Sequence, residues 1–422
     1  MANPSPAPRP TRVRYRVLGM TVAVYMITYM DRVVISNAAP SIRADLGLSL
    51  VAMAWILASF RWSYALFQIP GGWLGDRIGP RRALTLIVTW WSIFTCATAM
   101  TWNATSMGLV RLLFGVGEAG AFPIATRSLS RWLLPTERGL AQGLTHAGSR
   151  FGAAITPPLV VYIISLYGWR AAFYIFGSLG LVWSAVWFAW YRDTPAEHAA
   201  VNQAERQLIQ EASRESRKAG AALSLKDLFA SPTVLYLYAA YFCYTYALAT
   251  YLDWFPTYLK EYRHYSLTQM GFYAMLPLLA GTTGDFLGGW VSDIRVRQTG
   301  NLNARRSIAI GGFVAGAIFI IPATLTTSPG MCVLFTCLAF FGLEMTVGVS
   351  WAIPLDIAGD RAGSVSAVMN MCGNIGGAIS PLVLGYVVKS YGWNVPFFIT
   401  AGLCVLGALL YCKIDMERKV AA

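Results

Sequence analysis

The chain has 422 residues, of which 56% are hydrophobic and only 13% are charged, and its formal net charge is +13. Soluble domains carry about 25% charged residues, so a soluble enzyme, a disordered protein and a small disulfide scaffold are all excluded. A membrane-spanning helix needs about 20 apolar residues, and roughly twelve such spans fit this length. The composition therefore predicts an all-α polytopic membrane protein.

Apolar windows place the expected spans in two sets of six. The first set lies near residues 16–38, 51–75, 83–102, 106–128, 139–164 and 171–191. The second set lies near 232–259, 267–292, 306–326, 330–354, 362–388 and 394–412. Residues 193–230 are rich in Glu, Arg, Lys, Gln, Ala and Ser and hold no apolar run, which is typical of a surface linker. We therefore expect a six-helix bundle over 1–192, a linker over 193–230, and a second six-helix bundle over 231–422.

Two short motifs of the first half recur in the second half, in the same order and at nearly the same offset. Residues 71–76, GGWLGD, are matched by residues 288–293, GGWVSD. Residues 168–173, GWRAAF, are matched by residues 392–397, GWNVPF. This pattern indicates a duplicated unit, which is typical of transporters whose two halves rock around a site at their interface.

Basic residues concentrate on one side of the expected membrane. That side holds the N-terminal tail, the segments after the second and fourth spans, the linker, residues 295–306, and the C-terminal tail with Arg418 and Lys419. Because Lys and Arg favour cytoplasmic segments, the sequence predicts an inner-membrane protein with both termini in the cytoplasm. Topology accounts for these short basic clusters, so the expected surroundings are the lipid bilayer, and nucleic acid is not an expected partner.

Motifs for catalysis or metal binding are absent from the sequence. The seven cysteines lie within or at the ends of apolar runs and show no CxxC or Cys/His ligand spacing. Neither G-x-S-x-G nor H-E-x-x-H occurs. We therefore expect no enzyme, no bound metal and no cofactor, with protons as the coupling ion. One chain suffices for a complete pathway, so a functional monomer is expected.

The segment after the second span resembles a known loop signature. Residues 72–82, GWLGDRIGPRR, resemble the G-x-x-x-D-R-x-G-R-R loop of the major facilitator superfamily, with Pro80 displacing one Arg position. The glycines permit close helix packing, and Asp76 can pair with a basic side chain in one conformation only. We interpret Asp76 and Arg77 as a conformational latch, the alternative being a purely topological anchor.

Within that superfamily the chain resembles the anion:cation symporter group, which includes bacterial permeases for galactonate, glucarate and hexuronates and the vesicular organic-anion carriers of animals. The resemblance covers nearly the whole chain and rests on Tyr29-Met30-Asp31-Arg32, Tyr64, Arg111 with Glu118, Thr156-Pro157-Pro158 and Trp254-Phe255-Pro256-Thr257-Tyr258. It implies that Asp31 and Glu118 take part in proton coupling. It also implies that Arg32 and Arg111 serve the anionic substrate and its charge network.

Asp31, Arg32, Arg111 and Glu118 can also be interpreted from physical principles. An ionised side chain in a bilayer core costs at least about 2.5 kcal/mol, so it is rarely kept without a partner or a function. Asp31 and Arg32 point about 100° apart around their helix, whereas Arg111 and Glu118 share one helix face. We expect Arg32 to bind a substrate carboxylate in a central cavity and Asp31 to face Arg111. Protonation of Glu118, and of Asp31, would then offset the substrate's charge; the alternative is a static neutral network.

Other polar and aromatic residues are candidates for lining the cavity of a hydroxylated anion. Hydroxyls and amides can hydrogen-bond substrate OH groups, and aromatic rings can pack on a polyol; interhelical packing is the alternative. A second cation, Arg150, would suit a dicarboxylate or a bulkier acid. The candidates are Tyr29, Tyr64, Ser149 and Arg150 in the first half, and Tyr251, Trp254, Ser350, Trp351, Asn370 and Asn374 in the second.

Three further acids fall inside expected spans: Asp253, Asp285 and Glu344. Each is a candidate second proton site, a cation contact or the partner of an unidentified basic group. The sequence thus predicts a proton-coupled symporter that takes up an organic anion by alternating access, and it favours a sugar acid such as an aldonate, uronate or aldarate. The alternative is a facilitator or exporter of another carboxylate, an aromatic or dicarboxylic acid.

Overall fold

The first half of the chain folds into a helical bundle. The computed structural model describes residues 9–215, 229, 231–358 and 362–417, and no strand occurs among them. The helices of this bundle are α1 (Val13–Leu46), α2 (Leu50–Thr98), α3 (Ala104–Glu118), α4 (Ala121–Trp132), α5 (Arg138–Tyr167) and α6 (Trp169–Trp190). Within it α1 packs on α5, and α2 packs on α3, α4 and α6.

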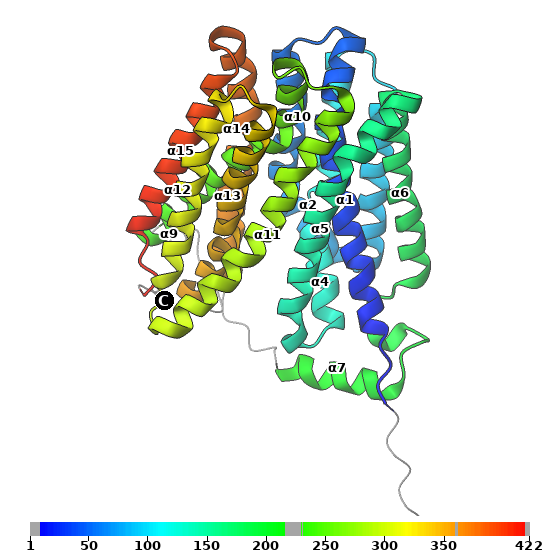
Figure 1. Cartoon of the computed structure of the whole chain (residues 1–422). Helices are drawn as coiled ribbons and strands as arrows, with labels where there is room; N and C mark the ends of the chain where they lie inside the picture. The colour runs from blue at the N-terminus through cyan, green and yellow to red at the C-terminus, as the bar shows by residue number, and fades with distance from the viewer. Residues whose placement is uncertain (1–8, 216–228, 230, 359–361, 418–422) are drawn as a thin grey trace, which may run out of the picture.

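The second half forms a separate bundle beside the first (Figure 1). Its segments are α9 (Pro232–Ala249), η3 (Thr250–Trp254), α10 (Phe255–Thr257), η4 (Tyr258–Tyr262), α11 (Leu267–Thr299), α12 (Ala304–Leu325), α13 (Pro329–Ala358), α14 (Ala362–Tyr391) and α15 (Asn394–Lys413). Here α13 packs on α11 and α12, and α9 packs on α14 and α15. The two bundles meet where α5 lies against α11 and where α2 lies against α14.

Each expected span coincides with helical structure. Nine segments of the described residues are long and apolar enough to cross a membrane. The windows 83–102, 232–259 and 267–292 are not among these segments, so the full count of twelve crossings stays a prediction. The predicted linker is described only in part, because residues 216–228 and 230, like Arg418 and Lys419 of the C-terminal tail, lie outside the described residues.

Two expected spans are joined in α2 across a kink. At Gly79 the backbone leaves the helix, with φ 79° and ψ 155°, and Pro80 follows. A side chain at residue 79 would be strained by the positive φ, and its Cβ would lie 2.6 Å from Oδ2 of Asp193. Asp193 accepts a hydrogen bond from the Arg81 amide at 2.9 Å. Only glycine therefore fits this corner.

The backbone repeats the duplication seen in the sequence. Gly168 and Gly392 both adopt φ 79°, and each precedes the last helix of its bundle, α6 and α15. These two glycines open the repeated GW motifs. The match supports the interpretation of two related six-helix units.

The start of α1, the end of α15 and the linker helix lie at one end of the molecule (Figure 1). Helix α7 (Gln203–Glu215) follows the short η2 (Pro195–Glu197) and crosses beneath the first bundle. We call this end the terminal face and the opposite end the far face. α1 therefore runs from the terminal face to the far face, and α2 begins at the far face.

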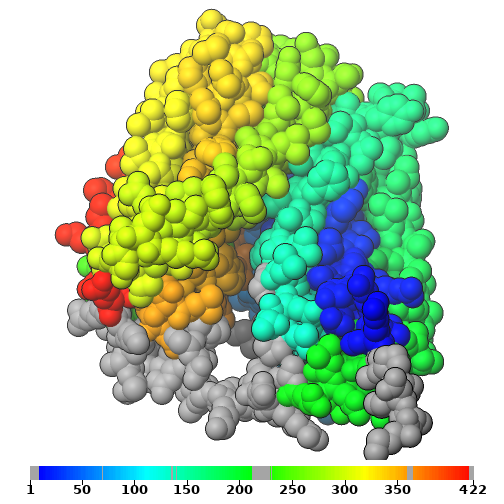
Figure 2. Space-filling view, turned by 60° about the horizontal axis from the view of Figure 1, so that its bottom comes forward, coloured from blue at the N-terminus to red at the C-terminus, as the bar shows by residue number. Residues whose placement is uncertain are grey.

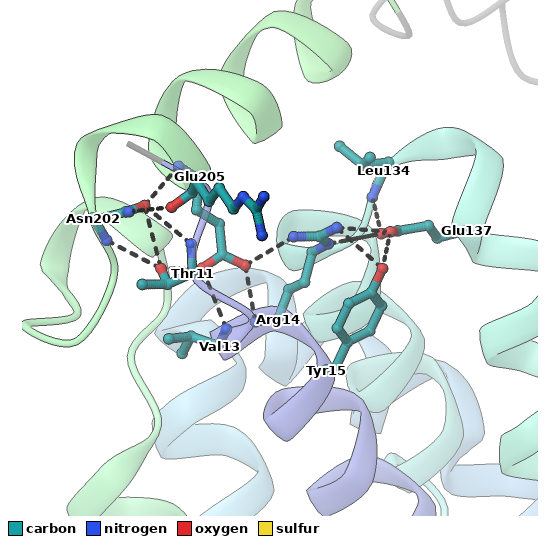
Figure 3. A network of polar contacts seen from close by, with 9 residues as sticks. Thr11, Val13, Arg14, Tyr15, Leu134, Glu137, Asn202 and Glu205 are labelled. Carbon is teal, nitrogen blue, oxygen red and sulfur yellow. Dashed lines mark hydrogen bonds and ion pairs between the residues drawn. The ribbon is translucent and has the colours of Figure 1, made fainter. Parts of the chain in front are cut away.

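A polar network fastens α7 to the first bundle (Figure 3). Glu205 of α7 is fully buried and accepts hydrogen bonds from the Thr11 hydroxyl at 2.5 Å and from the amides of Val13 and Arg14. Its carboxylate thus satisfies two of the free amides at the N-terminus of α1. Arg14 also pairs with Glu205 at 3.1 Å and with Glu137, in η1 (Pro135–Glu137), at 3.1 Å.

Candidate functional site

The terminal face is hollowed between the bundles, whereas the far face is joined by side-chain contacts. Figure 2 shows the hollow between the orange atoms of the second bundle and the blue-green atoms of α4 and α5. From mid-depth toward the far face, the bundles are joined by the ion pairs Arg150–Glu344, Arg61–Asp253 and Arg43–Glu261. Near the far face the Trp55 indole also donates to the Tyr386 hydroxyl at 3.1 Å.

Arg32 lies in an aromatic cage and pairs with Glu118. Its Nε donates to Oε1 of Glu118 at 2.5 Å, and its guanidinium carbon lies 4.5 Å from the ring centre of Tyr64 and 5.1 Å from that of Tyr29. The rings of Phe60 and Phe122 complete the cage. Glu118 is fully buried, whereas the Arg32 side chain keeps 20% of its surface exposed. A partly exposed guanidinium held over rings is suited to binding an anion.

Asp31 turns away from Arg32, as their helical spacing predicts. The indole of Trp91, on α2, donates to Oδ2 of Asp31 at 3.1 Å. The carboxylates of Glu118 and Asp31 both attract the Arg111 guanidinium electrostatically. Arg111 is 1% exposed, and its guanidinium carbon lies 4.1 Å from the ring centre of Phe114.

This cluster is not a closed network of hydrogen bonds. Oδ1 of Asp31, Oε2 of Glu118, and Nε and Nη1 of Arg111 are buried without a hydrogen-bond partner. Buried polar atoms of a purely structural network are normally satisfied. The two orphaned carboxylate oxygens are atoms at which a proton can bind, and the choice between a titrating cluster and a static one stays a prediction.

A second charged cluster joins the bundles at mid-depth. Nη2 of Arg150, on α5, lies 2.8 Å from Oε2 of Glu344, on α13. The Tyr244 hydroxyl donates to the other Glu344 oxygen at 3.0 Å. The charge of Asp285, on α11, acts on both Arg150 and Glu344. The basic partner of Glu344 is therefore Arg150, which the sequence placed only among the substrate contacts.

Arg61 is a charged residue that the sequence interpretation missed. Its Nε and Nη2 donate to the two oxygens of Asp253, each at 2.9 Å. Asp253 lies in η3, a π-helical turn, and such turns are frequent at functional sites. The signal was present in the sequence, because Arg61 is a basic residue inside the second apolar window.

The predicted latch residues lie near the terminal face. Asp76 pairs with Arg127 of α4, and the Arg77 guanidinium lies over the Trp73 ring at 5.2 Å. In the second bundle, Arg305 reaches Asp293 at 2.5 Å and Asp356 at 2.9 Å. Both repeats therefore place an acid–arginine contact at this end of the fold.

The other predicted lining residues are divided between the bundle interface and helix packing. Trp351 donates to the Tyr241 hydroxyl at 3.1 Å, and Asn374 donates to the Asn370 carbonyl at 2.9 Å; these three candidates are half-buried. The Ser149 hydroxyl bonds the carbonyl of His146 in its own helix.

Three candidates of the second half are buried. Trp254 is fully buried against Trp393, and Ser350 shares a hydrogen bond with Tyr411 at 2.7 Å. Tyr251 lines a small cavity with Asn37 of the first bundle. In this conformation Trp254 and Ser350 serve the packing of the second bundle, and their role in substrate binding stays a prediction.

Two helical bundles with charged residues at their interface are typical of membrane transporters. The profile of the Major Facilitator Superfamily matches residues 21–381. The chain belongs to the Major Facilitator Superfamily, as the loop signature at 72–82 predicted.

Similar proteins transport organic anions. The probable sulfoacetate transporter of Cupriavidus necator is 39% identical over 94% of this chain and 93% of that protein. The D-galactonate transporter of Escherichia coli is 30% identical over 98% of this chain and 99% of that protein. The hexuronate transporter of Bacillus subtilis is 31% identical over 91% of this chain and 90% of that protein.

A solved structure shares the fold. It is a bacterial homolog of the human lysosomal transporter Spinster, in an inward-facing and unoccupied conformation. The TM-score is 0.80 at 18% sequence identity, over 95% of this chain and 96% of that chain.

Proposed function

We propose that this protein is a proton-coupled symporter that takes up an organic anion by alternating access. The terminal face is then the cytoplasmic face, in keeping with its basic residues. The present conformation is open to the cytoplasm. The bundles rock about the site, so that the far face opens when the terminal face closes.

The observation that carries this proposal is the Arg32–Glu118 pair inside its aromatic cage. The carboxylate of a substrate competes with Glu118 for the Arg32 guanidinium, which suits planar carboxylates. Once displaced, Glu118 is a buried carboxylate without its cation, and taking up a proton removes that cost. Anion and proton are thereby loaded together.

The side chains around Arg32 and the relatives support two candidate substrate classes. The hydroxyls of Tyr29 and Tyr64 beside Arg32, and the amides of Asn370 and Asn374 in the second bundle, suit a sugar acid. Sulfoacetate is a second candidate, because the relative with 39% identity is a probable sulfoacetate transporter. Arg150 would supply a second cation for an anion charged at both ends.

Uptake by proteoliposomes tests the proposal. The panel contains aldonates, uronates, aldarates, sulfoacetate and aromatic acids, with an imposed inward proton gradient. We expect one anion to accumulate and a protonophore to abolish its accumulation. Accumulation that persists with the protonophore would instead show a carrier without proton coupling.

A single variant tests the coupling residue. Glu118→Gln keeps the size of the side chain and removes its titration, so we expect proton-driven accumulation to be lost while anion exchange between the two sides persists. Asp45→Asn is the control, because Asp45 is an exposed acid at the far-face end of α1 and accumulation should survive there. Loss of both accumulation and exchange in Glu118→Gln would favour the static network.

A further inference from the structure

Among the residues that the structure describes, three ion pairs join the bundles, and in all three the arginine and the carboxylate are distributed in the same way. Each arginine belongs to the first bundle: Arg43 on α1, Arg61 on α2 and Arg150 on α5. Each carboxylate belongs to the second bundle, on η4, η3 and α13 respectively. When the far face opens, the first bundle is left with unpaired cations and the second with unpaired acids. The opened first bundle would therefore attract an anion arriving from that side.

Among these pairs, Arg61–Asp253 has the geometry of a bound carboxylate. Two nitrogens of one edge of the guanidinium donate to the two carboxylate oxygens, each at 2.9 Å. This fork is the arrangement in which arginine binds free carboxylates. Asp253 is 7% exposed. Besides Arg61, Arg111 also attracts its carboxylate electrostatically.

Arg61 lies at the surface where the bundles separate. A Cβ added to Gly377 of α14 would lie 3.0 Å from Nη1 of Arg61, so the guanidinium packs directly on the second bundle. Counting along α2 from Leu50, Arg61 lies about 16 Å below the far-face end of the helix at 1.5 Å per residue. It is thus deeper than Arg43, which lies close to the far-face end of α1, and nearer to the far face than Arg32, which lies further from that end of α1.

We propose that Arg61 is an anion-binding residue of the far-open form and that Asp253 is its built-in substitute ligand in the present form. The anion is an organic carboxylate or sulfonate entering from the far face. Its binding to Arg61 replaces the Asp253 carboxylate and so favours separation of the bundles on that side. This inference rests on the proposed function, because it supplies the first contact of the same transported anion.

Opening of the far face can be measured with a cysteine at Ala274. This residue is 5% exposed and lines the small cavity between the bundles, so a sulfhydryl there becomes accessible when the far face opens. Labelling by an impermeant maleimide is measured from the far-face side, against the same chain without the Ala274→Cys change. We expect Arg61→Gln, Asp253→Asn and the control Glu261→Gln each to raise labelling, because each breaks one pair that closes this face.

Affinity for the anion from the far side separates a binding residue from a structural one. Opening alone raises apparent affinity, since more protein is competent to bind; Glu261→Gln measures that effect. Asp253→Asn should raise affinity further, because the competing carboxylate is gone. Arg61→Gln should lower the affinity for the anion by roughly tenfold, the effect of losing about one hydrogen bond between charged groups. This loss should occur even though the same variant opens the far face and is labelled more. The probes are sulfoacetate and D-galactonate.

The double variant Arg61→Gln/Asp253→Asn guards against misfolding, because it leaves neither charge unpaired. It should match the low affinity of Arg61→Gln and keep the raised labelling. An affinity for Arg61→Gln as high as that of Glu261→Gln would overturn the proposal. If the unmodified chain transports neither probe, the proposed substrates are wrong, but the labelling experiment still tests the inference. Labelling of Arg61→Gln and Asp253→Asn equal to that of the parent would then overturn the inference.

Discussion

At the residue scale, the contacts of Arg32 depend on the shape of the guanidinium group as well as on its charge. Arg32 uses Nε to donate to Glu118 and lays its planar group over the Tyr64 ring. Lysine has no equivalent of Nε and cannot form a fork with a carboxylate. We therefore expect that a positive charge alone is not sufficient at this position.

We expect Arg32→Lys to raise the half-saturating anion concentration by about tenfold or more, the effect of losing a hydrogen bond between charged groups. Uptake kinetics in proteoliposomes measure the change. Arg12→Lys, at an arginine preceding α1, is the control and should leave the kinetics unchanged. An Arg32→Lys protein with parental kinetics would show that charge alone is required.

The space beside individual glycines differs strongly within one helix. A Cβ on Gly115 of α3 would lie 2.2 Å from the Ser63 hydroxyl and 2.5 Å from the Phe60 carbonyl, whereas a Cβ on Gly108 of the same helix meets nothing within 4 Å. Overpacking typically costs about 1–3 kcal/mol. We expect Gly115→Ala to lower the unfolding temperature and Gly108→Ala to preserve or raise it, since alanine favours helices. Equal shifts would contradict the close α2–α3 contact.

At the element scale, the sequence predicted the helices better than their pairing. Apolar windows indicated the place of each span because burial in lipid demands long apolar runs. The kink at Gly79 and the π-turn around Asp253 were missed, since they depend on neighbouring segments. The partners Arg61–Asp253 and Arg150–Glu344 were also missed. A sequence shows which side chains are charged, but the helix faces that meet are set by packing.

The linker helix α7 is anchored to the first bundle, because Arg14 of α1 pairs both with Glu205 of α7 and with Glu137 of η1. Burial alone would raise the pKa of Glu137, but hydrogen bonds from Arg14, Tyr15 and the Leu134 amide outweigh it and lower the pKa. Folding thus favours the ionised form. The stabilising contribution of the ionised carboxylate is present above the unfolded-state pKa of about 4.3 and is lost as the pH falls through the lower folded-state pKa.

We expect Glu137→Gln to lower the unfolding temperature at pH 7 by about 1 °C for each 1 kcal/mol lost, because the unfolding entropy of a 422-residue chain is roughly 0.9 kcal/mol/K. The difference from the parent should shrink in acid, where Glu137 of the parent also becomes neutral. Thermal unfolding across a pH series measures both effects. Glu197→Gln, an exposed acid in η2, is the control. A difference that stays constant into acid would contradict a role for the ionised carboxylate.

At the scale of the whole molecule, the two faces differ in what holds the bundles together. Ion pairs and the Trp55–Tyr386 contact join them from mid-depth to the far face, while the terminal face is hollowed (Figure 2). The latch contacts of Asp76 and Asp293 lie within single bundles. Each bundle can therefore move as a unit, and the proposed alternating access requires the far-face contacts to break.

Fixing the far face should consequently stop transport in both directions. Trp55 and Tyr386 are both exposed, and their side chains meet across the bundle boundary. In a chain whose exposed Cys412 is replaced by serine, Trp55→Cys and Tyr386→Cys joined by a bismaleimide should abolish uptake and exchange, because the anion cannot reach the site from that side. Each single-cysteine variant treated with the same reagent should remain active. A cross-linked carrier that still exchanges its anion would mean that the bundles need not separate at the far face.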